Sequence, residues 1–157
     1  MGLYEFNVYD IMRTNASNHA DRVGFIDSNQ RCTFRQFKDR VDLVANGLLS
    51  NGVQKGDRLG VLAKNSLEYF VLYGAAAKVG AIMLVINWRL STPEVAFILK
   101  DCTPRLVFAD EEYQDPMSKA SANVDSVKNY FAMGEEKGLF QSFASLLLIF
   151  CLCLLVY

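Results

Sequence analysis

Trp88 and Arg89 are the residues of this sequence best placed to contact a ligand. They directly follow the apolar run Ile82–Ile86. Proteins of the α/β class build ligand-binding loops where their buried strands end. Packing and a salt bridge are the alternative role for the same two side chains. We therefore treat Trp88 and Arg89 as candidate substrate-binding residues and leave the nature of the substrate contact unassigned.

Outside this pair, the sequence offers no conventional catalytic constellation. It contains neither the G-x-G-x-x-G pattern of dinucleotide binding nor the G-x-x-x-x-G-K-[ST] pattern of a phosphate loop. His19 is the only histidine, so no serine or cysteine has a conventional activating base. A zinc site of the usual kinds has too few ligands for the same reason. We assign no catalytic, cofactor-binding or metal-binding residue.

The remaining carboxylates and thiols have structural explanations. Glu68 and Glu94 stand at expected helix starts, where negative charge is favourable. Glu111 and Glu112 lie in a turn-rich segment and are expected to form a solvated surface pair. The four cysteines lack the spacing of a small disulfide scaffold, and we expect buried, reduced thiols; they are Cys32, Cys102, Cys151 and Cys153.

Composition limits the class of protein. A chain of 157 residues that is 52% hydrophobic and 21% charged is typical of one folded domain. The net charge of −1 comes from 16 basic and 17 acidic residues spread along the chain, without a basic block. This pattern argues against a nucleic-acid surface. The N-terminal residues lack a basic region followed by an apolar core, so we predict no secretory signal.

Extended segments recur along the chain. A hairpin is predicted over residues 23–34, where Asp27, Ser28 and Asn29 supply turn chemistry. Further strands are predicted over residues 58–63, 82–86, 105–109 and 129–133. The run 82–86 is apolar throughout, which is typical of a strand that is buried on both faces.

Helix boundaries are predicted from caps and breakers. Thr33 and Gln36 form a capping-box pattern that starts a helix, and Asn51–Gly52 ends it. Two further caps and one break in the chain are predicted, at Asn65 with Glu68, at Thr92 before Pro93, and at Asp115–Pro116. Strands and helices alternate with short connections. This alternation predicts an α/β fold, in which helices cover both faces of a mainly parallel sheet.

An ordered series of short motifs resembles one enzyme family. Thr33-Phe34 with Phe37, the run GVQKGDRLGVLAKNSLEYF (52–70), the run KVGAIMLVINWRL (78–90) and the run STPEVAFILKD (91–101) each match a segment of the AMP-forming acyl-CoA ligases. Their order and spacing carry the resemblance over roughly residues 5–137. The Trp88–Leu90 segment and the EVAFIL helix are most similar to the fatty-acyl members. The resemblance implies part of the large N-terminal domain of the adenylate-forming fold, a partial three-layer α/β/α unit.

The same resemblance implies a chemistry. Enzymes of this family use ATP and Mg²⁺ to convert a carboxylic acid into an acyl-adenylate, and then transfer the acyl group to coenzyme A. A Ser/Thr/Gly-rich loop must surround the triphosphate, and a mobile lysine must stabilise the reacting carboxyl. The family carries these groups downstream of the segments matched here. We therefore expect this chain alone to be inactive and to bind none of ATP, Mg²⁺ and CoA.

The end of the chain departs from the family pattern. The resemblance implies a ligase-domain portion at residues 1–137 and an apolar tail at residues 138–157. Residues 146–157 are uninterrupted apolar sequence, shorter than the ~20 residues that a membrane span needs. A truncated or frame-shifted copy of a longer gene is the favoured explanation. A membrane contact through residues 139–157 of an otherwise cytoplasmic protein stays open.

Two other classes of function remain as alternatives. One is a non-catalytic α/β binding module that pairs with a separate chain. The other is a small protein that reuses the fold behind a C-terminal membrane anchor. The acid that is activated and the oligomeric state are beyond the sequence.

Overall fold

A parallel sheet of five strands forms the centre of the molecule. A computed structural model describes residues 6–27 and 30–147. The strand order is β4-β3-β5-β6-β7, and every neighbouring pair is parallel. The strands are β3 (Arg58–Leu62), β4 (Ile82–Val85), β5 (Leu106–Asp110), β6 (Asn129–Met133) and β7 (Gln141–Ser142). The order reverses at β3, because β4 lies on one side of it and β5, β6 and β7 follow on the other.

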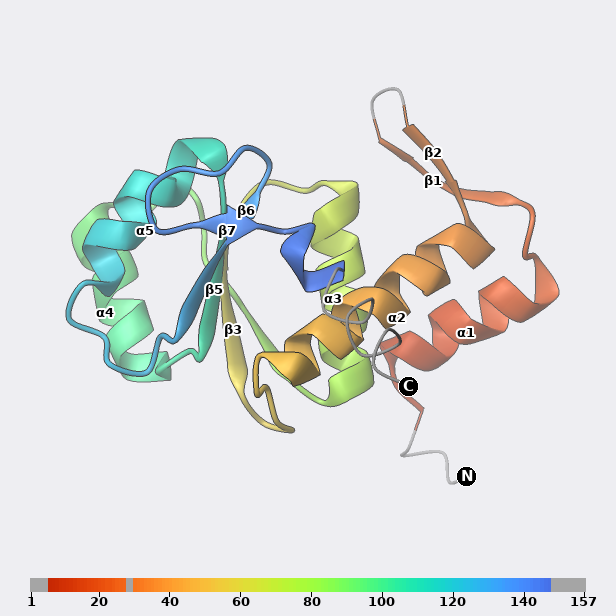
Figure 1. Ribbon diagram of the computed structural model, residues 1–157, viewed down its shortest axis with the longest axis horizontal. Helices are drawn as coiled ribbons and strands as arrows, with labels where there is room; N and C mark the ends of the chain where they lie inside the picture. The colour runs from red at the N-terminus through yellow and green to blue at the C-terminus, as the bar shows by residue number, and fades with distance from the viewer. Residues whose placement is uncertain (1–5, 28–29, 148–157) are drawn as a thin grey trace, which may run out of the picture.

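Helices cover both faces of this sheet (Figure 1). One face carries α2 (Phe34–Ser50) and α3 (Leu67–Val79), and the other carries α4 (Thr92–Cys102) and α5 (Gln114–Ser121). A short 3-10 turn, η2 (Glu111–Tyr113), joins β5 to α5. The α/β architecture predicted from the alternation of strands and helices is confirmed.

The N-terminal residues pack beside α2 and α3 (Figure 1). They form α1 (Val8–Asn18) and the predicted hairpin, whose antiparallel strands are β1 (Val23–Asp27) and β2 (Gln30–Thr33). Helix α1 was not predicted. Its start is capped by Asn7, which accepts hydrogen bonds from the backbone N–H of Tyr9 and Asp10. The Asp27 carboxylate accepts from Leu67 N at 2.9 Å, which ties the hairpin to the start of α3.

Each face of the sheet has its own apolar core. Phe37 and Val41 of α2 belong to one core with Phe108 and Phe131 of the sheet, and the last two rings are stacked with centroids 5.3 Å apart. Phe143 and Leu146, near the end of the described chain, belong to this same core. The core on the opposite face contains residues of β3, β5, α4 and α5, among them Leu62, Val107, Leu99 and Met117.

The partly buried carboxylate of Asp42 links α1, α2 and α3. Asp42 of α2 accepts a hydrogen bond from the Tyr9 hydroxyl at 2.8 Å and from Lys78 Nζ at 2.7 Å. Lys38 Nζ lies 2.7 Å from its second oxygen. Burial alone would raise the pKa of Asp42, but the hydrogen bonds from Lys38, Lys78 and Tyr9 hold that pKa below its usual value.

Three local predictions about helix boundaries are wrong. The cap of α3 is Ser66 rather than Asn65, since the Ser66 hydroxyl accepts from Tyr69 N at 3.2 Å. The cap of α4 is Ser91 rather than Thr92, and Glu94 accepts from Ser91 N at 2.8 Å. Asp115–Pro116 lies within the first turn of α5 and does not break the chain. A proline is tolerated there because its missing N–H has no partner in the first turn.

The prediction that residues 82–86 form a strand buried on both faces is also wrong. They form β4, which is an edge strand that pairs only with β3. Ile82 is 52% exposed and Val85 is 56% exposed. The apolar run is genuine, but β4 has a neighbour on only one side, so part of each side chain stays uncovered.

The C-terminal part of the described chain joins the sheet. β7 pairs in parallel with β6, with Phe131 opposite Gln141. No helix among residues 6–27 and 30–147 is long and apolar enough to cross a membrane. The greater part of the predicted tail, with Cys151 and Cys153, lies outside the described residues. Cys32 and Cys102 are free thiols, and Cys32 is buried. The division into residues 1–137 and 138–157 stays a prediction.

Candidate functional site at the carboxyl edge of the sheet

The point where the strand order reverses lies between β3 and β5. In open parallel sheets, such a switch point leaves a crevice outside the carboxyl ends of the strands, because the two connecting segments diverge to opposite faces. Here the crevice is bridged by the chain itself. The backbone N–H of Lys64, just after β3, donates to Asp110 Oδ2 at the end of β5, at 2.7 Å.

The Lys64 side chain organises the aromatic residues around this point. Its ammonium forms a salt bridge with Glu112. It also lies 5.3 Å from the ring centroid of Trp88 and 5.8 Å from that of Tyr113. The ring centroids of Trp88 and Tyr113 are 6.2 Å apart. Segments that follow β3, β4 and β5 therefore meet in one cluster of a cation and two aromatic faces, which we call the switch-point cluster (Lys64, Trp88, Arg89, Glu112 and Tyr113).

Trp88 and Arg89 lie where the sequence placed them, in the segment that follows β4 after Ile86 and Asn87. The Asn87 side chain accepts from Arg89 N at 3.0 Å and shapes the turn. The Arg89 guanidinium stacks on Trp88, with its central carbon 4.0 Å from the ring centroid. Both side chains are exposed. Within the described part of the chain, Arg89 makes no salt bridge, so its charge is available to an external anion.

Asp110 has an unusual environment for a carboxylate. Burial raises the pKa of Asp110, and the negative charges of Glu112 and Glu68 raise it further, against the hydrogen bond from Lys64 N and the Lys64 charge. Raised carboxyl pKa values of this kind are over-represented at functional sites, although structural networks produce them too.

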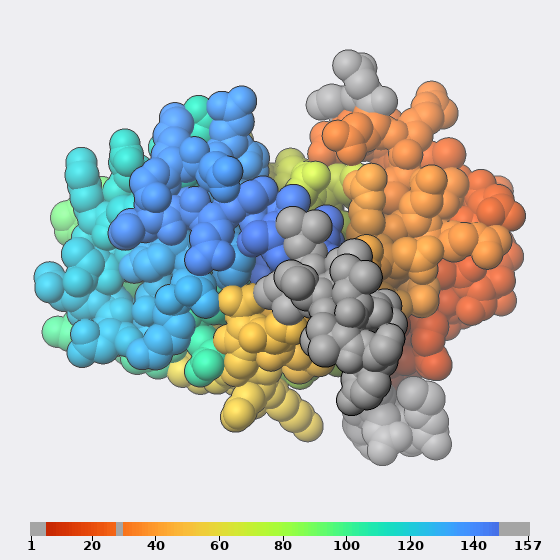
Figure 2. Space-filling model, in the orientation of Figure 1, coloured from red at the N-terminus to blue at the C-terminus, as the bar shows by residue number. Residues whose placement is uncertain are grey.

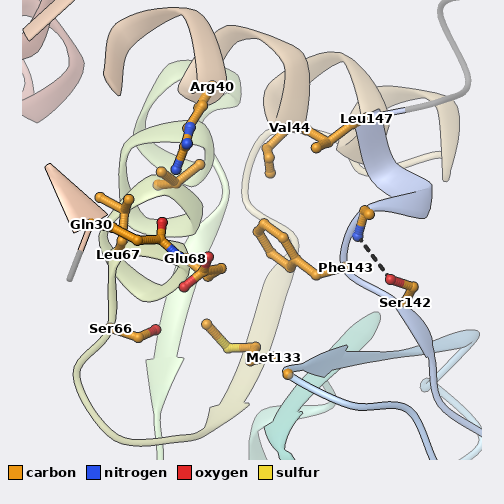
Figure 3. A pocket seen from close by; sticks show the side chains of 13 residues that line it. Gln30, Arg40, Val44, Ser66, Leu67, Glu68, Met133, Ser142, Phe143 and Leu147 are labelled. Carbon is orange, nitrogen blue, oxygen red and sulfur yellow. Dashed lines mark hydrogen bonds between the residues drawn. The ribbon is translucent and has the colours of Figure 1, made fainter. Parts of the chain in front are cut away.

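A hollow opens on the α2–α3 side of the same edge. Its volume is about 540 Å³. It is lined by residues of β2, α2 and the start of α3, and by the ends of β6 and β7 with the segments that follow them. Figure 3 shows its labelled side chains, with Met133 at one end and Val44 and Leu147 toward the other.

Neither a cluster of metal ligands nor a glycine-rich phosphate loop occurs among the described residues. No group of at least three His, Cys, Asp or Glu residues that could hold a metal occurs within residues 6–27 and 30–147. The described glycines with positive φ stand in separate turns, among them Gly52, Gly56 and Gly80, and do not form a phosphate loop. The start of α3 is already capped by Ser66 and Asp27.

Sequence reasoning found part of the cluster. It identified Trp88 and Arg89 but missed Lys64 and Tyr113 of the cluster, and it missed the neighbouring Asp110. A signal did exist, because Lys64 follows the predicted strand 58–63 and Asp110 follows the predicted strand 105–109. Glu111 and Glu112, expected to be a solvated pair, are surface residues that each have a lysine partner; these partners are Lys137 and Lys64.

Comparison with known proteins gives one consistent result. The sequence profile described as AMP-binding enzyme matches residues 12–142. The long-chain-fatty-acid–CoA ligase FadD13 of Mycobacterium tuberculosis H37Rv is 42% identical over 77 residues, which are 49% of this chain and 15% of that protein.

Solved structures have the same fold. A candidate long-chain-fatty-acid CoA ligase from Rhodopseudomonas palustris CGA009 superposes with a TM-score of 0.88 at 37% identity, covering 92% of this chain and 37% of that one. The N-terminal domain of FACL13 from Mycobacterium tuberculosis superposes with a TM-score of 0.77 at 28% identity, covering 82% and 34%. The chain thus spans well under half the length of the relatives that it matches.

Proposed function

The chain belongs to the family of AMP-binding enzymes, and from this premise we propose that it supplies the N-terminal part of an ATP-dependent acyl-CoA ligase for a fatty acid. One observation carries the proposal: the family profile covers residues 12–142, which include the sheet and the helices on both of its faces. The fatty-acyl substrate class is supported by the similarity to the ligase FadD13 and to the R. palustris structure.

The proposed reaction has two steps. The carboxylate attacks the α-phosphorus of ATP and forms an acyl-adenylate with loss of pyrophosphate. The CoA thiolate then attacks the acyl carbon, and AMP leaves. Since the described residues contain neither a cluster of metal ligands nor a glycine-rich phosphate loop, the groups that hold ATP and Mg²⁺ are assigned to the part of a ligase that this chain does not match. We propose that the 157-residue chain alone catalyses neither step.

We assign Trp88 and Arg89 a role in substrate binding within the assembled ligase. Arg89 is exposed, carries no salt bridge among the described residues and is held flat on the Trp88 ring. A guanidinium in this position can pair with an anionic group, and the indole supplies a surface for stacking. The location at the switch point, where open α/β sheets bind ligands, supports this role.

A chimeric enzyme tests the proposed function. Residues 12–142 would replace the matching segment of FadD13, and fatty-acid-dependent exchange of pyrophosphate into ATP would be measured. The chimera should catalyse this exchange, and the free 157-residue chain should not. A chimera that is folded and monodisperse but inactive would sink the proposal.

The same chimera tests the site residues. Replacing Arg89 with Met removes the charge and keeps most of the stem that covers Trp88. We expect kcat/KM to fall about tenfold, the loss of one charge-assisted hydrogen bond. Arg31→Met, at an exposed position of the hairpin, is the control and should leave kcat/KM unchanged. Equal losses in both variants would count against a role of Arg89 in substrate binding.

The proposed location is the cytoplasm, with a membrane contact through residues 139–157 as the open alternative. Extraction of membranes with alkaline carbonate separates the two. Retention of the chain in the pellet would support an anchor, and release would count against an integral one. Co-purification of a complementary chain would instead support a non-catalytic module.

A further inference from the structure

Residues 110–114, which follow β5, contact the segments that follow other strands at the carboxyl edge of the sheet. The Asp110 carboxylate accepts from Lys64 N after β3, and the Tyr113 ring lies beside Trp88 after β4. Among the residues that the structure describes, the side chains of Asp110 and Tyr113 do not cap the helical turns that begin after them. This segment is therefore held by its neighbours at the edge rather than by local caps.

Gln114, the first residue of α5, is the buried member of this segment and is 1% exposed. Its amide nitrogen donates to Glu135 O at 2.7 Å, and its amide oxygen accepts from Lys137 N at 2.8 Å. Both main-chain groups belong to the connection between β6 and β7, which we call the β6–β7 loop (residues 134–140). This loop lies on the surface beside α5 (Figure 2). The Gln114 amide thus fixes the β6–β7 loop to the start of α5.

The hydrogen bonds of Gln114 should outweigh the other contact with the same loop. Glu111 forms a salt bridge with Lys137 at 2.7 Å, but the two side chains are 46% and 53% exposed. Surface pairs of this kind contribute little to stability. Loss of the Gln114 amide would instead leave buried main-chain groups without partners, which costs more. The position of residues 110–114 relative to the β6–β7 loop therefore depends mainly on Gln114.

We propose that Gln114 is a positioning residue for Trp88 and Arg89. It acts through Tyr113, the residue before it, whose ring centroid lies 6.2 Å from that of Trp88. The Arg89 guanidinium is stacked on the same indole. By fixing the residue next to Tyr113, Gln114 fixes the aromatic surface on which Arg89 is held. The inference rests on the proposed function only in giving Arg89 a substrate to bind, and its first test needs no ligase activity.

Trp88 is the only tryptophan of the chain, so its fluorescence reports on this site directly. In the 157-residue chain, Gln114→Met keeps the length of the side chain and removes both hydrogen bonds. With the circular dichroism of the parent retained, the emission of Trp88 should shift to longer wavelength and acrylamide should quench it more strongly, because the indole loses the support of Tyr113.

Ser121→Ala is the matched control. Ser121 is also a buried polar residue of α5, but its hydroxyl donates to Met117 O at 2.8 Å and contacts the Tyr130 hydroxyl, away from the β6–β7 loop. This variant loses a buried hydrogen bond of the same helix, so it measures the effect of a general loss of stability. Its Trp88 emission and quenching should equal those of the parent.

A second variant and an activity measurement complete the test. Gln114→Asn has a shorter amide that cannot reach both main-chain groups, and it should change the Trp88 fluorescence in the same direction even where Gln114→Met does not fold. In the FadD13 chimera, Gln114→Met and Arg89→Met should each lower kcat/KM about tenfold, and the double variant should lose little more, because both changes affect one contact.

Parent-like Trp88 fluorescence in both Gln114 variants, or a change of equal size in Ser121→Ala, would overturn the proposal. So would losses of kcat/KM that multiply in the double variant. A chimera that is inactive with the parent residues would count against the proposed ligase function alone, and the fluorescence of the 157-residue chain would then decide the role of Gln114.

Discussion

At the scale of single residues, the contact between Lys64 and Asp110 lies at the carboxyl edge of the sheet. The Asp110 carboxylate joins the end of β5 to the segment after β3 by accepting from Lys64 N. The same burial that places it there disfavours its charge and raises its pKa. A carboxyl with a raised pKa in the folded state stabilises the protein most at low pH, and this contribution is lost as the pH rises through the raised pKa.

Asp110→Asn should therefore change the pH dependence of stability in a defined direction. The amide oxygen can still accept from Lys64 N, but it carries no charge. Below about pH 4, where an ordinary aspartate is protonated, the variant and the parent should have similar free energies of unfolding. At higher pH the parent should lose stability that the variant keeps. Urea unfolding at several pH values measures the free energy of unfolding of both proteins. If that free energy changes between low and neutral pH by the same amount in the variant and in the parent, the prediction is wrong.

The residues of the candidate site differ in how far the sequence could predict them. Trp88 and Arg89 were found because they follow the apolar run 82–86, with only Asn87 between. Lys64 and Asp110 could not be joined from sequence, since their contact exists only because β3 and β5 are neighbours in the sheet. The strand order depends on which helix crosses to which face, and local patterns do not contain that information.

At the scale of elements, the Asp42 carboxylate links α1, α2 and α3. Its oxygens receive groups from all three helices, through Tyr9, Lys38 and Lys78. Because these contacts hold the pKa of Asp42 below its usual value, the stabilisation is present at neutral pH and is lost as the pH falls through the lowered pKa.

Asp42→Asn should destabilise the chain by about 1–3 kcal/mol at neutral pH, since it leaves two lysines without their shared carboxylate. The difference from the parent should shrink in acid, once Asp42 of the parent is protonated. The control is Asp39→Asn on the same helix, where the carboxylate is exposed and lies 3.5 Å from Lys38. The free energy of unfolding of that variant should stay within about 0.5 kcal/mol of the parent's. Equal effects of both changes would refute the role of Asp42 in linking the three helices.

Whether a segment forms a helix or a strand was easier to predict than how far that segment is buried. The strands and α2 to α4 follow from apolar periodicity and from caps such as Thr33 with Gln36, which form a capping box as predicted. Helix α1 was missed although Asn7 and Asp10 supply the same kind of cap. The two misplaced caps each moved by one residue, because Asn65–Ser66 and Ser91–Thr92 both offer adjacent capping side chains. The exposure of β4 could not be predicted, since a strand's own sequence does not fix its position in the sheet.

At the scale of the whole molecule, we expect the free edge of β4 to promote association of the chain. Edge strands with exposed apolar side chains are templates for pairing with other chains. We expect the 157-residue chain alone to be poorly soluble. A monodisperse monomer that melts cooperatively would contradict this expectation.

Charges on that edge should restore a monomer. Ile82→Lys with Val85→Lys places charges at positions that are 52% and 56% exposed, so the cost in stability should be small. Size-exclusion chromatography with light scattering should show a larger monomer fraction than for the parent chain. Val61→Lys, at a neighbouring strand position that is 0% exposed, should unfold the protein instead.

The core on the α2–α3 face is assembled from residues far apart in the order of synthesis. Phe37 and Val41 leave the ribosome early, whereas Phe143 and Leu146, which belong to the same core, are among the last described residues to be made. At about 5–20 residues per second, the separation of about a hundred residues means roughly 5–20 s of translation. During that interval the apolar face of α2 lacks the covering that Phe143 and Leu146 supply in the folded chain.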